Sequence, residues 1–401
     1  MRSRISSRIQ RIKPSPSVAA ADRAAELRRE GRDIINLAVG EPDFDTPLHI
    51  RQAACEAIAR GETRYTANVG TPALRQAIVD KLQRENDLYY TPNDIIVTCG
   101  AKHAFFNALA VTMEANDEVV IPAPFWVSYP DMVLACDGLP VIVPCDEDSG
   151  FKLSPAALEK AITPRTRWLV LNSPVNPTGA VYSEAEMRAL AGVLLFHPQV
   201  MLMTDDIYEH IRFDDVQFRH IVAVEPRLKS NTLVINGVSK SYAMTGWRIG
   251  YAAGPQDVIR AMDTLQSQST SNACSISQAA AVAALRGDQG FVASSNEVYR
   301  ARRDLGLKLL NDIPGMQCRS PGGAFYLYVK CSGLIGRRTE KGRILETDSD
   351  FVLYLLDEVG VATVAGSSYG LSPYFRMSIA TDLAIIREGC VRIARAVKSL
   401  M

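Results

Sequence analysis

The chain has 401 residues, of which 47% are hydrophobic, so it can bury a large core arranged in two or three structural units. Lysine plus arginine and aspartate plus glutamate number 44 each, so the net charge favours neither nucleic acid nor an anionic membrane as a partner. We therefore expect small-molecule partners, with no binding to nucleic acid or membrane.

The eight cysteines have neither C-x-x-C pairing nor the spacing of metal ligands, which argues against zinc and disulfide frameworks. They indicate reduced thiols, and we expect a cytoplasmic protein without a metal. Residues 1–17 are rich in arginine and serine and lack the apolar core of a secretory signal. This composition fits an organelle transit peptide or a basic arm that lies on a neighbouring subunit, and we favour the arm.

Helix starts are marked early in the chain. Thr46-Pro47 and Thr71-Pro72 each place a capping hydroxyl before a proline at the first helical position, and Gly61 can end the first of these helices. Short apolar runs then alternate with helical patterns. The runs predict strands at 94–98, 118–122, 140–144, 167–172, 200–204, 232–236 and 248–253. Runs that are apolar on both faces are typical of a central, mainly parallel sheet covered by helices.

The pattern changes after about residue 255. Helical stretches continue through 298–310, and they are followed by a strand-like segment at 322–330, a helix at 348–360, a strand at 375–380 and a closing helix. This order indicates a smaller α+β unit. We therefore expect an α/β fold of three segments. These are an N-terminal arm with part of the small domain (1–45), a large domain (46–285) and a C-terminal small domain (286–401).

In a doubly wound sheet, ligands bind where the strands end at their carboxyl side. Gly100, Ala101 and Lys102 follow the first predicted strand and can present backbone N–H groups at a helix N-terminus, an arrangement suited to phosphate. The fingerprints of nucleoside triphosphate and dinucleotide sites are absent from the sequence. The phosphate is therefore expected to belong to a smaller compound.

Lys240 follows the predicted strand at 232–236, in a turn rich in glycine, serine and threonine. Burial lowers the pKa of a lysine, and its neutral amine can then condense with a carbonyl group. If the carbonyl compound is a pyridine aldehyde phosphate, its ring nitrogen needs a carboxylate to stay protonated. Asp205, at the end of the 200–204 run, is the best candidate.

Seven segments together resemble one family. They lie at 40–47, 64–78, 124–130, 172–180, 205–210, 237–251 and 374–381, and they cover nearly the whole chain in the family's order. The chain resembles the class I aminotransferases of fold type I, the aspartate aminotransferase family, which use pyridoxal 5'-phosphate (PLP). It is most similar to the bacterial branch of aspartate and aspartate/prephenate aminotransferases. The resemblance implies that 46–285 is the PLP-binding domain.

The resemblance also implies residue roles. Lys240 would carry PLP as a Schiff base and then move a proton between the substrate Cα and the cofactor. The implied cofactor contacts are Gly100, Ala101, Lys102, Trp126, Asn176, Asp205, Tyr208, Ser239 and Arg248, with Tyr65 reaching the phosphate from the other subunit of a homodimer. The implied substrate contacts are Gly40, Lys102, Trp126, Asn176 and Arg376. The planar guanidinium of Arg376 would bind the α-carboxylate of the substrate through two parallel hydrogen bonds.

The implied reaction is a ping-pong amino transfer in amino acid biosynthesis, with L-aspartate and 2-oxoglutarate as the leading pair. The alternatives are an aromatic or prephenate aminotransferase, a C–S lyase or decarboxylase, and a regulator that borrows the fold.

Several positions leave the substrate open. Lys102 could bind the substrate's distal carboxylate, or it could be a solvated lysine of the phosphate-binding loop. Ser15 and Ser17 could belong to an arm that closes over the substrate, or they could cap a local turn. Segment 267–280 has no arginine where animal-type relatives place one. Ala101, Gly237 and Ala279 also differ from residues common among the relatives.

Overall fold

The computed structural model describes residues 4–401, so the first three residues of the expected arm lie outside it. The α-helices are α1 (Ser7–Gln10), α2 (Pro16–Arg29), α3 (Leu48–Ala59), α4 (Pro72–Asn86), α5 (Ala101–Thr112), α6 (Ser128–Ala135), α7 (Pro155–Ala161), α8 (Glu184–Phe196), α9 (Ile221–Val224), α10 (Gln256–Ser267), α11 (Ser275–Arg286), α12 (Gly290–Asn311), α13 (Asp348–Val359) and α14 (Leu383–Lys398). The strands are β1 (Ile35–Asn36), β2 (Ile95–Thr98), β3 (Glu118–Ala123), β4 (Leu139–Pro144), β5 (Thr166–Asn172), β6 (Met201–Asp205), β7 (Thr232–Gly237), β8 (Gly250–Ala253), β9 (Gln317–Cys318), β10 (Tyr326–Lys330), β11 (Val361–Ala362), β12 (Val364–Ala365) and β13 (Tyr374–Ser378).

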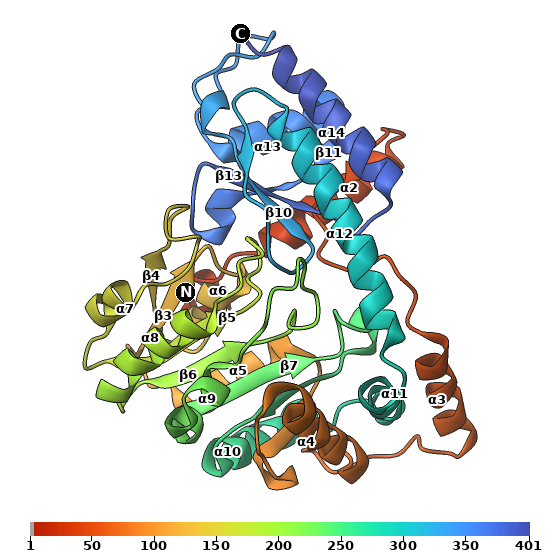
Figure 1. Ribbon diagram of the computed structural model, residues 1–401, viewed down its shortest axis with the longest axis vertical. Coiled ribbons are helices and arrows are strands. Elements are labelled where there is room, and N and C mark those ends of the chain that lie inside the picture. The colour runs from red at the N-terminus through yellow and green to blue at the C-terminus, as the bar shows by residue number, and fades with distance from the viewer. Residues whose placement is uncertain (1–3) are drawn as a thin grey trace.

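A seven-stranded sheet forms the centre of the molecule, in the order β2, β8, β7, β6, β5, β3, β4 (Figure 1). Strand β8 runs antiparallel to both of its neighbours, whereas the pairs from β7 to β4 are all parallel. All seven strands lie where the apolar runs predict them. The predicted α/β fold with a mainly parallel sheet is therefore confirmed.

Both faces of this sheet are buried except along the edge strand β4, where most residues are exposed or half-buried. Along β5, Trp168 and Val170 pack into one core cluster, and Leu169 and Leu171 pack into another. Helices α5, α6 and α10 contribute to the first cluster, whereas α4, α8 and α11 contribute to the second. A fully buried side chain of this kind stabilises the fold by about 1.5–3 kcal/mol. Because neither face meets water, these strands are apolar at successive positions rather than at alternate ones.

Two of the three predicted helix boundaries are confirmed, and one is wrong. The Thr71 hydroxyl accepts a backbone N–H in the first turn of α4, and Gly61 follows α3 with φ of 75°. Thr46, in contrast, does not cap α3 with its side chain. Its hydroxyl donates to the carbonyl of Ala243 at 2.6 Å and accepts from the Trp247 indole at 3.0 Å. Thr46 is buried against this distant loop, which the local pattern does not reveal.

The C-terminal part contains a four-stranded antiparallel sheet in the order β12, β13, β10, β9. Helix α12 runs from this part toward the large sheet (Figure 1). Helices α13 and α14 lie at the end of the C-terminal part that is far from the large sheet. Strand β1 pairs with β11, so residues 35–36 lie against the C-terminal part. The domain boundaries themselves stay a prediction.

The described part of the N-terminal arm lies on its own chain. Arg8 and Arg11 both form ion pairs with Asp137, and the Lys13 N–H donates to Asp131 at 3.1 Å. These contacts hold the arm beside α6, and the expected contact with a neighbouring subunit stays a prediction. Over residues 4–401, none of the helices combines the length and apolar character needed to cross a membrane.

Candidate active site

A pocket of about 300 Å³ lies at the carboxyl ends of β5, β6 and β7, where Arg376 of β13 also reaches it. It brings together nearly all of the side chains singled out from the sequence. The predicted residues that line it are Gly40, Ala101, Lys102, Trp126, Asn176, Asp205, Tyr208, Ser239, Lys240, Arg248 and Arg376. Gly100 is the residue that precedes α5 at the edge of this pocket.

Lys240 is half-buried in the wall of the pocket, and its Nζ donates to the backbone carbonyl of Gly40 at 2.6 Å. Burial lowers the pKa of Lys240 to about 8, and the charges of Arg376 and Arg248 act in the same direction. Glu41 and Asp205 oppose this shift only in part. About a tenth of the Lys240 side chain is therefore an uncharged amine at pH 7, far more than for an ordinary lysine.

Asp205 ends β6 and is only 5% exposed. The Tyr129 hydroxyl donates to its Oδ2, and the Ile207 N–H donates to its Oδ1 at 3.3 Å. Burial raises the pKa of Asp205 to about 6, although both hydrogen bonds lower it. A buried carboxylate at this place favours a cationic or protonated group of a ligand. Tyr129 lies within the family-like segment at 124–130, yet the sequence does not identify it as a partner of Asp205.

Arg376 carries a buried guanidinium that contacts neutral groups. Nη1 donates to Asn176 Oδ1 at 3.1 Å, and Nη2 donates to the carbonyl of Ala38 at 2.6 Å. Its Nε is buried without a partner within residues 4–401. The rings of Tyr326 and Tyr369 lie 4.3 and 5.1 Å from the guanidinium carbon. A buried charge in neutral surroundings favours an anionic ligand, and a carboxylate matches the guanidinium fork.

The end of the pocket near α5 is suited to a phosphate. Gly100 precedes α5 with φ of 88°, and a Cβ at this position would lie 2.4 Å from Nη2 of Arg248. Arg248 donates to the carbonyl of Thr245 at 2.9 Å. Burial, together with Arg248, lowers the pKa of Lys102, whose Nζ lies 4.9 Å from the centre of the Trp126 ring. The first N–H groups of a helix lack acceptors within that helix, so donors and cations converge here.

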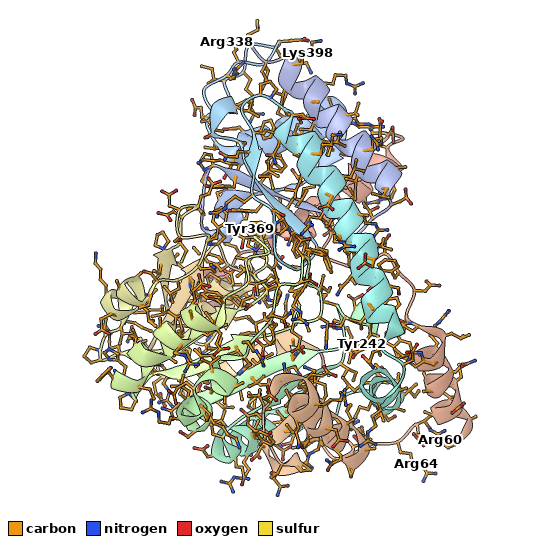
Figure 2. The ribbon with its side chains drawn as sticks, viewed as in Figure 1. Arg60, Arg64, Tyr242, Arg338, Tyr369 and Lys398 are labelled. Atoms are coloured by element: carbon orange, nitrogen blue, oxygen red, sulfur yellow. The ribbon has the colours of Figure 1, made fainter. Side chains whose placement is uncertain are left out.

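The arm also reaches the pocket. Ser15 and Ser17 line it, and the Ser17 hydroxyl lies 3.4 Å from that of Tyr369. Figure 2 shows Tyr369 where the C-terminal part meets the rest of the molecule. Ser15 precedes α2, but its side chain makes no capping hydrogen bond. The geometry therefore favours the closing-arm interpretation over local turn capping.

Tyr65 does not reach this pocket. It is 91% exposed and lines a separate hollow together with Arg60, Arg64 and Ala279. Figure 2 shows Arg60 and Arg64 extending outward at an edge of the molecule, far from Tyr369. The predicted role of Tyr65 requires a second subunit, so it stays a prediction.

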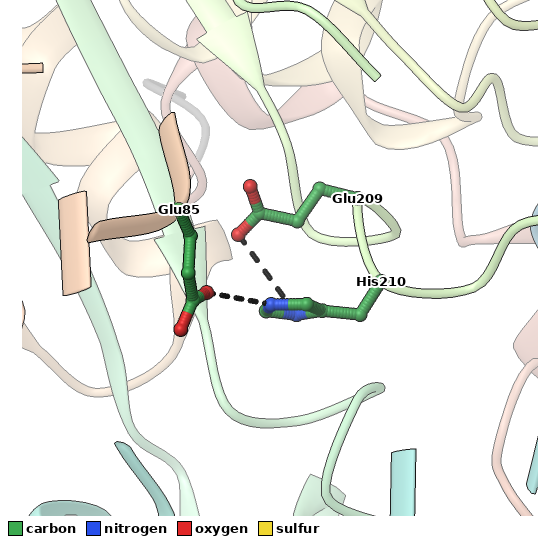
Figure 3. A group of neighbouring side chains, drawn as sticks. All are labelled: Glu85, Glu209 and His210. Atoms are coloured by element: carbon green, nitrogen blue, oxygen red, sulfur yellow. Dashed lines mark hydrogen bonds and ion pairs between the residues drawn. The ribbon is translucent and has the colours of Figure 1, made fainter. Parts of the chain in front are cut away.

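Beside the site, Glu85, Glu209 and His210 form a cluster with the spacing of metal ligands (Figure 3). The Lys81 ammonium already neutralises its two carboxylates, because it forms an ion pair with Glu209 and lies 3.6 Å from Glu85. Burial raises the pKa of Glu209, but Lys81 and His210 outweigh this effect and lower it to about 2. The cluster is an ion-pair network around the buried Lys81 and Glu209, which sequence reasoning missed.

The chain is similar to known aminotransferases over nearly its whole length. The family described as "Aminotransferase class I and II" matches residues 32–393. An aspartate/prephenate aminotransferase of Cereibacter sphaeroides is 53% identical over 389 residues, which are 97% of each chain. An aspartate aminotransferase of Rhizobium meliloti strain 1021 is 53% identical over 390 residues, which are 97% of this chain and 95% of the relative.

The chain is also similar to solved structures of aspartate aminotransferases. The crystal structure of an aspartate aminotransferase from Rhizobium meliloti superimposes with a TM-score of 0.97 at 52% identity, covering 100% of both chains. The aspartate aminotransferase of Thermus thermophilus with maleate has a TM-score of 0.92 at 41% identity, covering 99% of this chain and 100% of that one. This similarity extends to both parts of the molecule that form the pocket.

Proposed function

Because this chain belongs to the class I and II aminotransferases, a family of PLP-dependent enzymes, we propose that it transfers the amino group of L-aspartate to 2-oxoglutarate. Such an enzyme binds two substrates in turn at one site, so the site must recognise the groups that both share. The observation that carries the proposal is the Arg376 guanidinium, buried without a carboxylate contact in the same pocket as Lys240.

The pocket fits PLP in its donors and acceptors. Asp205 offers a buried carboxylate for a protonated ring nitrogen, and the start of α5 with Arg248 and Ser239 offers donors for a phosphate. When bound, PLP supplies a carbonyl group for amines and a ring that accepts electrons from the substrate Cα. Trp126 lines the same pocket and provides an aromatic face for that ring.

We assign the proton transfer to Lys240. Its neutral amine can accept a proton at the substrate Cα, and a pKa of about 8 keeps both protonation states accessible near neutral pH. The hydrogen bond to the Gly40 carbonyl holds Nζ in place before substrate binds. Lys240 is therefore the residue on which turnover depends most.

The remaining polar residues orient what is bound. Asn176 accepts from Arg376 through Oδ1, so its Nδ2 stays available as a donor in the pocket. We propose that Asn176 and the Tyr208 hydroxyl donate to the phenolic oxygen of PLP. Arg376 takes the α-carboxylate that every amino acid and 2-oxo acid carries, with the Gly40 backbone beside it.

The choice between substrates depends on the side of the pocket opposite Arg376, where the substrate side chain would lie. Lys102 supplies a cation for the distal carboxylate of aspartate, and Ser15 and Ser17 lie beside the pocket on the arm. Lys102 also lies over the Trp126 ring, so an apolar ring of a substrate would find an aromatic neighbour there. Together with the name of the Cereibacter sphaeroides relative, this supports prephenate or aromatic substrates as a second candidate.

We further propose a cytoplasmic homodimer that acts in amino acid biosynthesis. The eight cysteines are free thiols, as a reducing compartment requires. The exposed Tyr65 supports the dimer, since its aromatic ring has no core to pack against in one chain.

Steady-state turnover of the purified holoenzyme tests the function. We expect exchange between aspartate and 2-oxoglutarate, slower or comparable exchange with phenylalanine or prephenate, and loss of all turnover in Lys240→Ala. A wild-type enzyme that moves no amine from aspartate would defeat the leading proposal. Release of pyruvate and ammonia from cystathionine would favour a lyase instead.

A further inference from the structure

Tyr326 contacts two residues of the proposed mechanism at once. Its hydroxyl lies 2.7 Å from the Tyr208 hydroxyl, and its ring lies 4.3 Å from the guanidinium carbon of Arg376. We propose that Tyr326 is a positioning residue with two separable parts: its ring holds Arg376, and its hydroxyl directs the Tyr208 proton into the pocket. This inference rests on the proposed function and adds a residue that the motifs did not identify.

Strand pairing explains the contact with Arg376. Tyr326 pairs with Ser378 in the antiparallel register of β10 and β13, so Arg376 is its diagonal neighbour two residues along β13. Diagonal neighbours lie on the same face of a sheet, within reach of long side chains. Tyr369 faces the guanidinium from another direction at 5.1 Å. The two rings restrict the guanidinium, whose Nε has no hydrogen-bond partner within residues 4–401.

The hydroxyl of Tyr326 is held in place by its neighbours. A Cβ built on Gly40 would lie 2.4 Å from that oxygen, so the backbone approaches it closely. The rings of Tyr208 and Tyr326 meet edge to face, with centroids 5.8 Å apart. Little room remains for the hydroxyl to move away from Tyr208.

The number of hydroxyl protons on Tyr208 and Tyr326 explains the proposed role of the Tyr326 hydroxyl. Burial raises the pKa of Tyr208 and of Tyr326, so both hydroxyls keep their protons near neutral pH. Their mutual hydrogen bond uses only one of the two protons. If Tyr326 donates to Tyr208, the Tyr208 proton is free to donate into the pocket, and it becomes a stronger donor through the chain of hydrogen bonds.

Tyr326→Phe removes the hydroxyl and keeps the ring. We expect the visible absorbance band of the bound cofactor to titrate at higher pH in this variant, because weaker donation from Tyr208 stabilises the deprotonated phenolic oxygen less. The kcat should fall by roughly threefold to tenfold, since loss of one hydrogen bond weakens positioning. The KM for aspartate and the Kd for maleate should stay within about twofold. An unchanged or lowered absorbance midpoint would overturn this half of the inference.

Tyr326→Leu removes the ring as well. We expect the Kd for maleate, a dicarboxylate that cannot exchange an amine, to rise on the order of tenfold because Arg376 loses its cation–π contact. A Kd equal to that of Tyr326→Phe would overturn the role of the ring. If this variant does not fold, Tyr326→Met replaces it, because methionine fills irregular space better.

Tyr328→Phe is the matched control, since it makes the same change two residues away on β10. The Tyr328 hydroxyl donates to the backbone carbonyl of Leu371 at 2.8 Å, and the residue does not line the pocket. We expect wild-type absorbance titration and wild-type maleate binding, and a shift equal to that of Tyr326→Phe would overturn the assignment. A wild-type protein without a cofactor band or without amino transfer would instead contradict the proposed function.

Discussion

Arg376 is a buried charge whose structural cost would be offset by the substrate carboxylate that it is proposed to bind. It is 2% exposed, and its contacts are an amide oxygen, a backbone carbonyl and two aromatic rings. A charge in such surroundings keeps little of its hydration energy, and the missing stabilisation can come from a ligand. The site thus favours substrates with a carboxylate before any substrate side chain is recognised.

Arg376→Lys should therefore weaken binding of every substrate. We expect KM for both aspartate and 2-oxoglutarate to rise on the order of 10- to 100-fold, because an ammonium group cannot make two parallel charged hydrogen bonds. Steady-state kinetics measure this change. Arg392→Lys, on α14 and outside the pocket, is the control and should leave KM unchanged. A selective effect on only one substrate would contradict the α-carboxylate role.

Lys240 should react as an unusually acidic lysine in the cofactor-free protein. Its pKa is lowered to about 8 by burial, so the amine gains reactivity as pH rises through that value. An ordinary lysine does so near pH 10.4. Trace labelling with an amine reagent, followed by peptide mapping across pH, measures the midpoint for each lysine. A midpoint for Lys240 equal to that of exposed Lys341 would contradict the burial effect.

At the scale of elements, the loops that follow β6 and β7 are tied together on the side away from the pocket. Asn236 donates to Glu209 at 2.6 Å, and a ring nitrogen of His210 lies 3.0 Å from the Ser241 hydroxyl. Tyr208 and Lys240 are the sequence neighbours of these groups. The network around Lys81 therefore supports the loops that carry Tyr208 and Lys240, although Lys81 itself does not line the pocket.

Lys81→Met should destabilise the protein strongly. It leaves the buried Glu209 carboxylate without its cation, which typically costs about 3–5 kcal/mol of unfolding free energy. Urea denaturation of the wild type and the variant measures the difference. Lys341→Met, in an exposed ion pair with Glu358, should change stability by less than about 1 kcal/mol. Equal effects of the two substitutions would show that the Lys81 network contributes no special stability.

At the scale of the whole molecule, the pocket depends on parts that are distant in sequence. The seven-stranded sheet provides Asp205 and Lys240, whereas the C-terminal sheet provides Arg376 and the arm provides Ser17. A movement of one part relative to the other would change the distance between Lys240 and Arg376.

The proposed homodimer predicts that inactive chains can complement each other. Tyr65→Ala should bind the cofactor on the order of tenfold more weakly, because a charged hydrogen bond from the second subunit is lost. Mixed and refolded with Lys240→Ala, it should give hybrid dimers in which one site has both residues intact. The rate of amino transfer by the hybrid dimers, measured at a limiting cofactor concentration, tests whether activity returns. Absence of any regained activity in verified hybrids would contradict a shared site.

Much of the fold and the chemistry could be predicted because both leave local signals. Strands buried on both faces are continuously apolar, and Gly100, Asp205 and Lys240 follow such strands directly. The carboxyl ends of parallel strands meet at one edge, so these residues come together without knowledge of the loops. Resemblance to a family supplied the more distant Arg376, which no neighbouring pattern distinguishes from other arginines.

The sequence by itself thus determined the seven strands of the central sheet, its mainly parallel character and the residues at its ligand-binding edge. Only the tertiary structure decided that Tyr129 holds Asp205, that Tyr326 joins Tyr208 to Arg376, and that Thr46 contacts a loop instead of capping α3. The physical reason is that these contacts join segments far apart in the chain. Local propensity reports how one segment folds, whereas a side chain's partner depends on which other segment packs against it.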